Sequence, residues 1–262
     1  MTEEKMSLFA HLEDLRKRII ISLGAVIVAF IVAFSFSEEI LGLLMFPLRY
    51  SLDLDITTFT FQFVTTDKLK ATKLVFLAPT EAFWINMKVA FFAAIVASLP
   101  VIFHQLWQFI APGLHQKEKK YVIPFVLAGT ILFLVGAAFC FLIILPFDLG
   151  FLLTYKVGDY LMPMLSVGQY TDFCIKFILA FGSIFELPIL IIFLAKLGIV
   201  TPQTLKKQRR MAIVLAFVAG AVLTPTPDIF NQTLMAVPII LLYELGIILA
   251  VFFTKGKKDG DG

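Results

Sequence analysis

Few of the residue patterns that support catalysis occur in this sequence of 262 residues. The zinc-protease pattern HExxH and the serine-hydrolase pattern GxSxG are both absent. Its three histidines have no obvious Ser or Cys partner, and its two cysteines lie in apolar stretches without CxxC or metal-like spacing. These residues are His11, His104, His115, Cys140 and Cys174. We therefore expect no enzyme activity, no metal site and no cofactor, and we interpret the cysteines as small packing residues.

Two glutamates lie inside strongly apolar segments. Glu186 is near the middle of one, where an ionisable group costs several kcal/mol and usually faces a bundle interior or a cavity. Pro188 follows it and is expected to loosen the helix. Glu186 is a candidate functional residue, and the alternative is a buried glutamate hydrogen-bonded to a neighbouring helix. Glu244 lies nearer the end of its segment, where water relieves the cost, and both interpretations stay open.

The elements that carry these residues are membrane spans. The chain is 60% hydrophobic and 16% charged, against roughly 45–50% and 25% in soluble domains. Four segments are clear spans of about 20 apolar residues, namely 19–36, 83–106, 122–145 and 173–194. The last apolar block, 211–253, is interrupted by the turn residues at 223–228 and therefore predicts two more spans. The sequence thus predicts an all-α polytopic membrane protein with six helices, the fifth of them short.

The distribution of Lys and Arg predicts the orientation. Fifteen of these 22 residues fall on one side of the predicted spans and seven on the other, which places both termini in the cytoplasm. The net charge of only +3 gives no reason to expect a nucleic-acid partner. We expect a single domain over 1–262, with a cytoplasmic amphipathic segment at 1–18, a long external loop at 47–81 and a cytoplasmic tail at 254–262. Within the loop, Phe59, Phe61 and Phe63 alternate with polar residues and predict a strand.

Four segments together resemble one family from end to end. They are HLEDLRKR at 11–18, FIAPGL at 109–114 with EKK at 118–120, FG through FELP at 181–188, and LTP at 223–225 with PDIFNQT at 227–233. The order, spacing and placement of these segments are similar to those of TatC, the signal-reading subunit of the twin-arginine protein translocase. The PTEAF run at 79–83 is similar too.

This resemblance implies a site for the two adjacent arginines of a signal peptide. A guanidinium pairs with a carboxylate through two parallel hydrogen bonds, which Lys cannot copy. The resemblance assigns this role to Glu118 and Asp14, with Arg16 and Phe109 as further contacts. The family more usually has Glu at the position of Asp14, so the charge is kept on a shorter side chain. The alternative for Glu118 is a solvated charge among lysines.

The resemblance also implies the remaining architecture and partners. It places Glu186 in the concave face of a cupped bundle whose fifth and sixth helices are short. It places Thr224, Asp228 and Gln232 where single-span TatA- and TatB-type subunits dock, and for Asp228 the alternative is simple capping of the sixth helix. The implied function is export of folded proteins by a multimeric complex in the cytoplasmic membrane of a prokaryote, driven by the proton-motive force.

Two other classes of function fit the sequence less well. A secondary transporter of a small solute should contain paired repeats with broken helices at matching places, and no such symmetry is visible. An intramembrane enzyme should contain a catalytic pattern such as HExxH or GxSxG, and neither occurs in the sequence. Recognition of twin-arginine signal peptides, as the resemblance implies, is therefore the function that we expect.

Overall fold

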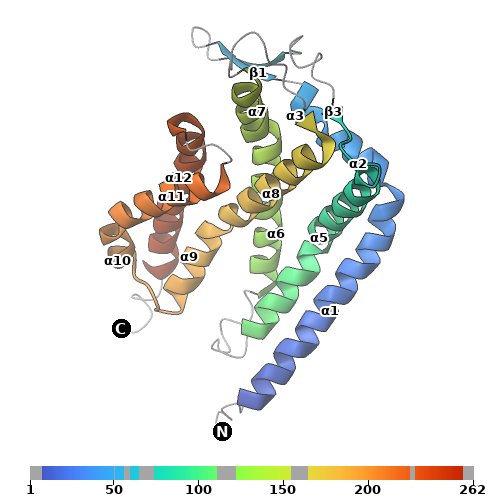
Figure 1. Ribbon diagram of the computed structural model, residues 1–262. Coiled ribbons are helices and arrows are strands. Elements are labelled where there is room, and N and C mark those ends of the chain that lie inside the picture. Colours follow the sequence, from blue (N-terminus) through green and yellow to red (C-terminus); the bar gives the residue numbers. More distant parts are fainter. Residues whose placement is uncertain are drawn as a thin grey trace, which may run out of the picture. The chain divides into compact units, whose positions relative to one another are not determined.

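A computed structural model describes residues 8–49, 51–55, 60–64, 74–110, 122–154, 165–224 and 228–255 (Figure 1). Most of these residues are helical. They fall into two compact units. Unit 1 combines residues up to 41 with 83–131, and unit 2 combines 42–82 with the chain from 132 onward.

Unit 1 is built on α1 (Leu8–Ser35), α5 (Glu81–Ile110) and the first part of α6 (Val122–Phe139). The 28 residues of α1 make a continuous helix of about 42 Å, so residues 8–18 of the predicted amphipathic segment and the first span are one element, and residues 1–7 lie outside the described part of the chain. Only 6% of its most apolar window is buried, against 28–44% in the four other long apolar helices of the described residues. This helix therefore presents almost all of its apolar surface outward, as a lipid-facing helix does.

Short elements follow α1. Helix α2 (Ser37–Leu44) lies at the boundary between the two units, and unit 2 continues with α3 (Phe46–Arg49), β1 (Ser51–Asp55) and β2 (Thr60–Val64), which lie at the start of the predicted external loop. The two strands pair antiparallel, with Ser51 opposite Val64 and Asp55 opposite Thr60. The predicted strand is confirmed for Phe61 and Phe63, whereas Phe59 lies outside the described residues. Its partner β1 was not predicted from the sequence.

A second, parallel pair of short strands joins distant parts of unit 2. Strand β3 (Leu74–Val75) pairs with β4 (Leu165–Ser166), which leads directly into α8 (Val167–Phe185). The pairing fixes the start of α8 next to the residues that lead into α5.

The third predicted span is longer than expected. After α6 the chain forms one π-helical segment, η3 (Cys140–Ile144), and continues as α7 (Leu145–Thr154). The second half of α6 packs tightly on α8 through a glycine on each helix. A Cβ at Gly182 would lie 2.5 Å from the Phe133 ring, and one at Gly136 would lie 2.6 Å from the Phe185 ring.

The fourth span breaks where the sequence predicted a loosened helix. Helix α8 ends at Phe185, and α9 (Leu187–Lys196) starts after Glu186. Pro188 has no N–H to donate to the carbonyl of Ile184, so the regular ladder of hydrogen bonds cannot continue through this point.

The last helices form a hairpin that packs on α9 (Figure 1). They are α10 (Pro202–Lys207), α11 (Arg209–Leu223) and α12 (Ile229–Lys255). Buried residues from α9, α10 and α12 form one core cluster, made of Ile191, Ala195, Leu205, Ile247 and Ala250. A second cluster, Ala216, Ala236 and Ile239, joins α11 to α12.

The described residues contain five helices or helix pairs that are long and apolar enough to cross a membrane. The predicted short fifth helix corresponds to α11, whose 15 residues span about 22 Å. The prediction that the sixth helix is also short was wrong, because α12 has 27 residues. Two features lengthen it. Asp228 caps its start, so the polar residues at 231–233 are helical, and Pro238 is accommodated inside the helix.

Candidate functional site

The predicted site residues fall into two groups. Asp14, Arg16 and Phe109 belong to unit 1, on the first turns of α1 and the last turn of α5. A second group belongs to unit 2 and comprises Glu186, Thr224, Asp228 and Gln232. Glu118, the other predicted carboxylate of the signal-peptide site, lies outside the described residues.

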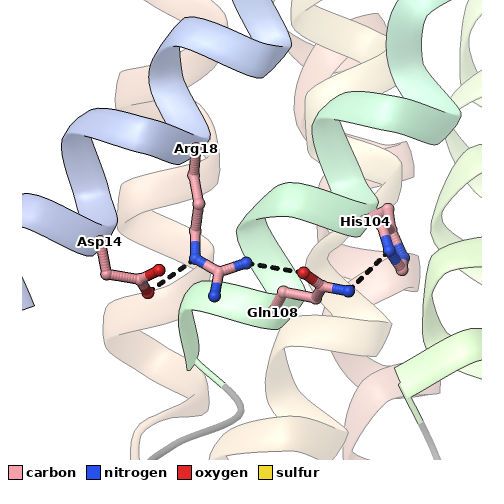
Figure 2. A network of polar contacts seen from close by, with 4 residues as sticks. All are labelled: Asp14, Arg18, His104 and Gln108. Carbon is pink, nitrogen blue, oxygen red and sulfur yellow. Dashed lines mark hydrogen bonds and ion pairs between the residues drawn. The ribbon is translucent and has the colours of Figure 1, made fainter.

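The Asp14 carboxylate is already bound to a guanidinium. Nε of Arg18, one helical turn further along α1, donates a hydrogen bond to Asp14 Oδ2 at 2.7 Å. Nη1 of Arg18 donates to Oε1 of Gln108 on α5 at 2.8 Å, and the Gln108 amide nitrogen lies 2.8 Å from Nε2 of His104. Figure 2 shows these four side chains as one chain of polar contacts between α1 and α5. The side chains of Asp14 and Arg18 are 24% and 17% exposed, so the pair is accessible from outside.

An aromatic stack and an apolar groove lie beside this network. The His11 ring stacks on the Phe109 ring, with centroids 4.4 Å apart. Phe109 and Arg18 also line a groove of about 380 Å³ between α1 and α5. The rest of its lining is mainly apolar and comprises Leu15, Ile19, Ser22, Leu23, Val26, Ile102, Gln105 and Leu106. The site in unit 1 thus combines a carboxylate, a guanidinium and an apolar groove.

Arg16 takes no part in this network. Its side chain is exposed, and the guanidinium that reaches Asp14 comes from Arg18 instead. Next to it, Lys17 pairs with Glu13 at 3.1 Å, and both of these side chains are about two-thirds exposed. The structure therefore brings Asp14, Phe109 and His11 near Arg18 and leaves Arg16 at the surface.

Glu186 lies at the break between α8 and α9 and is half-buried. Its Oε1 atom is buried and has no hydrogen-bond partner among the described residues. The carboxyl group nevertheless has a hydrogen bond with the backbone of Phe133 on α6, so the interpretation of a glutamate bonded to a neighbouring helix stays open.

The three polar residues at the α11–α12 hairpin all make internal contacts. The Thr224 hydroxyl donates to the carbonyl of Gly220 at 3.0 Å, and the Gln232 amide donates to the carbonyl of Phe217 at 2.9 Å. Asp228 accepts the backbone N–H of Asn231 at 2.8 Å and its side-chain amide at 3.0 Å. The capping role considered for Asp228 is confirmed. These contacts stabilise the end of α11 and the start of α12, and the bond from Gln232 to Phe217 joins the two helices.

Sequence reasoning missed several charged residues with defined environments. Glu81 accepts hydrogen bonds from the Ser166 hydroxyl, from Gly168 N at 2.8 Å and from Leu77 N at 2.5 Å, and so it ties the start of α5 to the start of α8. Asp148 lies three residues beyond the predicted third span (122–145), is fully buried in α7, and neither carboxylate oxygen has a hydrogen-bond partner among the described residues.

Glu244 has a partner that the sequence did not reveal. Nη2 of Arg209, at the start of α11, donates to Glu244 Oε2 on α12 at 2.6 Å. The side chains of Arg209 and Glu244 are 48% and 33% exposed. Of the two interpretations of Glu244, a glutamate bonded to a neighbouring helix agrees with this contact, although the pair is partly exposed.

The long apolar helices of the described residues define the class of this protein. This is a polytopic membrane protein whose spans carry a few partnered polar side chains. The family model described as "Sec-independent protein translocase protein (TatC)" matches residues 10–238, and the chain belongs to the TatC family.

Individual relatives agree with this assignment. A Sec-independent protein translocase protein TatC from Carboxydothermus hydrogenoformans is 37% identical over 261 residues, covering 100% of this chain and 99% of the relative. One from Helicobacter pylori is 40% identical over 251 residues, covering 96% and 90%. A crystal structure of a twin-arginine translocase receptor, TatC, superposes with a TM-score of 0.76 at 37% identity, covering 93% of this chain and 99% of that one.

Proposed function

We propose that this subunit of the twin-arginine translocase binds the signal peptides of folded cargo proteins at the end of unit 1 that carries Asp14. One observation supports this proposal above the others. The Asp14 carboxylate is partly exposed and holds a guanidinium at 2.7 Å, which is the group that a twin-arginine peptide presents. A site that accepts the protein's own arginine has the geometry to accept another.

The chemistry favours arginine over lysine. The planar guanidinium offers several donors in a fixed fork, whereas the ammonium of lysine is a compact point charge. Two adjacent arginines need two carboxylates, and we assign the second role to Glu118. The stack of His11 on Phe109 and the groove beside it supply apolar surface for the residues next to the arginine pair. Arg16, exposed on α1, remains part of the proposed site.

The proposed site requires that the end of unit 1 with Asp14 face the cytoplasm, where signal peptides are made. The excess of Lys and Arg on this side of the spans favours that orientation, and with an even number of spans it places both termini in the cytoplasm. The membrane is then the cytoplasmic membrane of a prokaryote.

We assign to unit 2 the contacts with the apolar part of the signal peptide and with the partner subunits. The apolar part of the signal peptide passes near Glu186, and single-span TatA- and TatB-type subunits dock at Thr224, Asp228 and Gln232. The exposed apolar side chains that flank this hairpin support docking of a helix there: Val222 is 78% exposed, Ile229 83% and Phe230 49%. A helix as short as α11 deforms the bilayer around it, which suits a multimeric complex that carries folded cargo under the proton-motive force.

The test is binding of a twin-arginine signal peptide to the full-length protein in detergent. We expect a twin-lysine peptide to bind at least about tenfold more weakly, a difference of about 1.4 kcal/mol. Asp14→Asn and Glu118→Gln should each lower the affinity for the twin-arginine peptide by a similar factor, because each removes the charge that pairs with a guanidinium.

Glu13→Gln is the matched control, because it removes an exposed carboxylate one residue from Asp14 whose partner is Lys17. It should leave binding within twofold of the unchanged protein. Equal affinity for both peptides, or an effect of Glu13→Gln as large as that of Asp14→Asn, would contradict the proposed site.

A further inference from the structure

Asp14 is an occupied carboxylate in this fold. Arg18 is four residues further along the same helix, and its Nε bonds to Asp14 Oδ2 at 2.7 Å. A second hydrogen bond, from Arg18 Nη1 to Gln108 Oε1 at 2.8 Å, ties the same guanidinium to α5 (Figure 2). Any guanidinium that arrives from a signal peptide meets one already in place.

We propose that Arg18 is an internal competitor that occupies Asp14 until an arginine of the signal peptide displaces it, and that it thereby sets the affinity of the site. This inference rests on the proposed function, because it concerns the regulation of the same carboxylate. Displacement exchanges one guanidinium–carboxylate pair for another, so releasing Arg18 offsets part of the free energy that the peptide gains at Asp14, and the observed affinity is lower than a free Asp14 would give.

The network shows how Arg18 is held in place and how it can leave. Its anchor on α5 is the Gln108 side chain, whose amide nitrogen lies 2.8 Å from His104 Nε2, which fixes the amide with its oxygen toward Arg18. Asp14 and Arg18 lie on one helix, so among the described residues the only hydrogen bond to α5 that breaks when Arg18 turns away is the one to Gln108. Their partial exposure gives both side chains room to turn outward.

A competitor of this kind has a definite thermodynamic signature. It lowers the observed affinity by the same factor for every ligand that must displace it, and so removing it leaves the ratio between two such ligands unchanged. Accessible pairs at this spacing on a helix are weak, so the factor should be about twofold to fivefold. A residue that positions Asp14 for the peptide has the opposite signature, because its removal weakens binding.

The experiment measures the affinity of full-length Arg18→Gln for the twin-arginine and twin-lysine peptides. We expect both to bind about twofold to fivefold more tightly than to the unchanged protein. Loss of one positive charge alone would also favour a cationic peptide, and Lys17→Gln controls for this because it removes the same charge one residue away. Lys17→Gln should change affinity by clearly less than Arg18→Gln.

Two further variants test independently whether Arg18 competes for Asp14. Gln108→Leu removes the anchor of Arg18 without touching Asp14, and it should tighten binding in the same direction by a smaller factor; it also serves if Arg18→Gln fails to fold. In an Asp14→Asn background, Arg18→Gln should bring no gain. Suppose that Arg18→Gln binds the twin-arginine peptide no more tightly than the unchanged protein, while binding still prefers twin arginine over twin lysine and still requires Asp14. This result would show that Arg18 is not a competitor and would leave the proposed function intact. If the unchanged protein itself bound the two peptides equally, the proposed function would be refuted instead.

Discussion

Two acidic side chains meet arginines in this protein, and the two pairs differ in what they connect. Asp14 and Arg18 are four residues apart on α1, a helix with only 6% of its most apolar window buried. Glu244 and Arg209 are 35 residues apart and connect α12 to α11, within a unit where both helices share buried cores. The first pair lies on one helix and reaches α5 through the hydrogen bond from Arg18 to Gln108, whereas the second directly links two packed helices. We therefore expect changes near Asp14 to act on binding and changes in unit 2 to act on stability.

The largest expected effect tests how tightly unit 2 is packed compared with α1. Gly182→Val places a side chain where a Cβ alone would already lie 2.5 Å from the Phe133 ring. Overpacking of this kind costs about 1–3 kcal/mol, and the rigid aromatic ring has little room to move. We expect a clearly lower midpoint of thermal unfolding in detergent.

Gly24→Val on α1 is the matched control, since nothing lies within 4 Å of a Cβ at that position. It should leave the midpoint nearly unchanged. Equal losses in the two variants would show that α1 is packed as tightly as α8, and the contrast between the two regions would then be lost.

The sequence predicted the elements of this protein better than their contacts. The break at Glu186 was predictable because Pro188 removes a donor locally, and the short α11 was predictable from the turn residues that follow it. The length of α12 was not predicted, although the Asp228 cap acts on Asn231 only three residues away and was considered from the sequence. Helix α12 also continues through Pro238, a residue that by local rules interrupts a helix.

The candidate site shows the same limit. Asp14 stood out as a carboxylate, and its spacing from Arg18 permits a pair, but the neighbouring Glu13 and Lys17 have the same spacing. What distinguishes Arg18 is Gln108, 90 residues away on α5. The partner of Glu244 was hidden for the same reason, since Arg209 reaches it only through the packing of α11 on α12. Contacts between helices carry no signal in a single sequence.

A smaller effect is expected at the pair that links α11 to α12. Glu244→Gln removes the charge that accepts a hydrogen bond from Arg209 at 2.6 Å. The side chains are 48% and 33% exposed, so solvent screens the pair, and we expect a loss of at most about 1 kcal/mol. A double-mutant cycle with Arg209→Gln should give a coupling free energy that decreases as salt is raised. A coupling near zero at low salt would mean that the pair does not join the two helices energetically.

The smallest effect on stability is expected at Asp14 itself, where the effect on binding is largest. Asp14→Asn breaks a pair between residues four apart on one helix, and such pairs stabilise a helix by about 0.2–0.5 kcal/mol. The thermal midpoint should therefore move no more than it does in Glu13→Gln, which breaks the pair with Lys17 at the same spacing. The two variants should differ only in peptide binding. If Asp14→Asn lowered the midpoint well beyond Glu13→Gln, the network through Gln108 and His104 would be part of what holds α1 against α5, and weaker binding by that variant could no longer be attributed to the lost carboxylate alone.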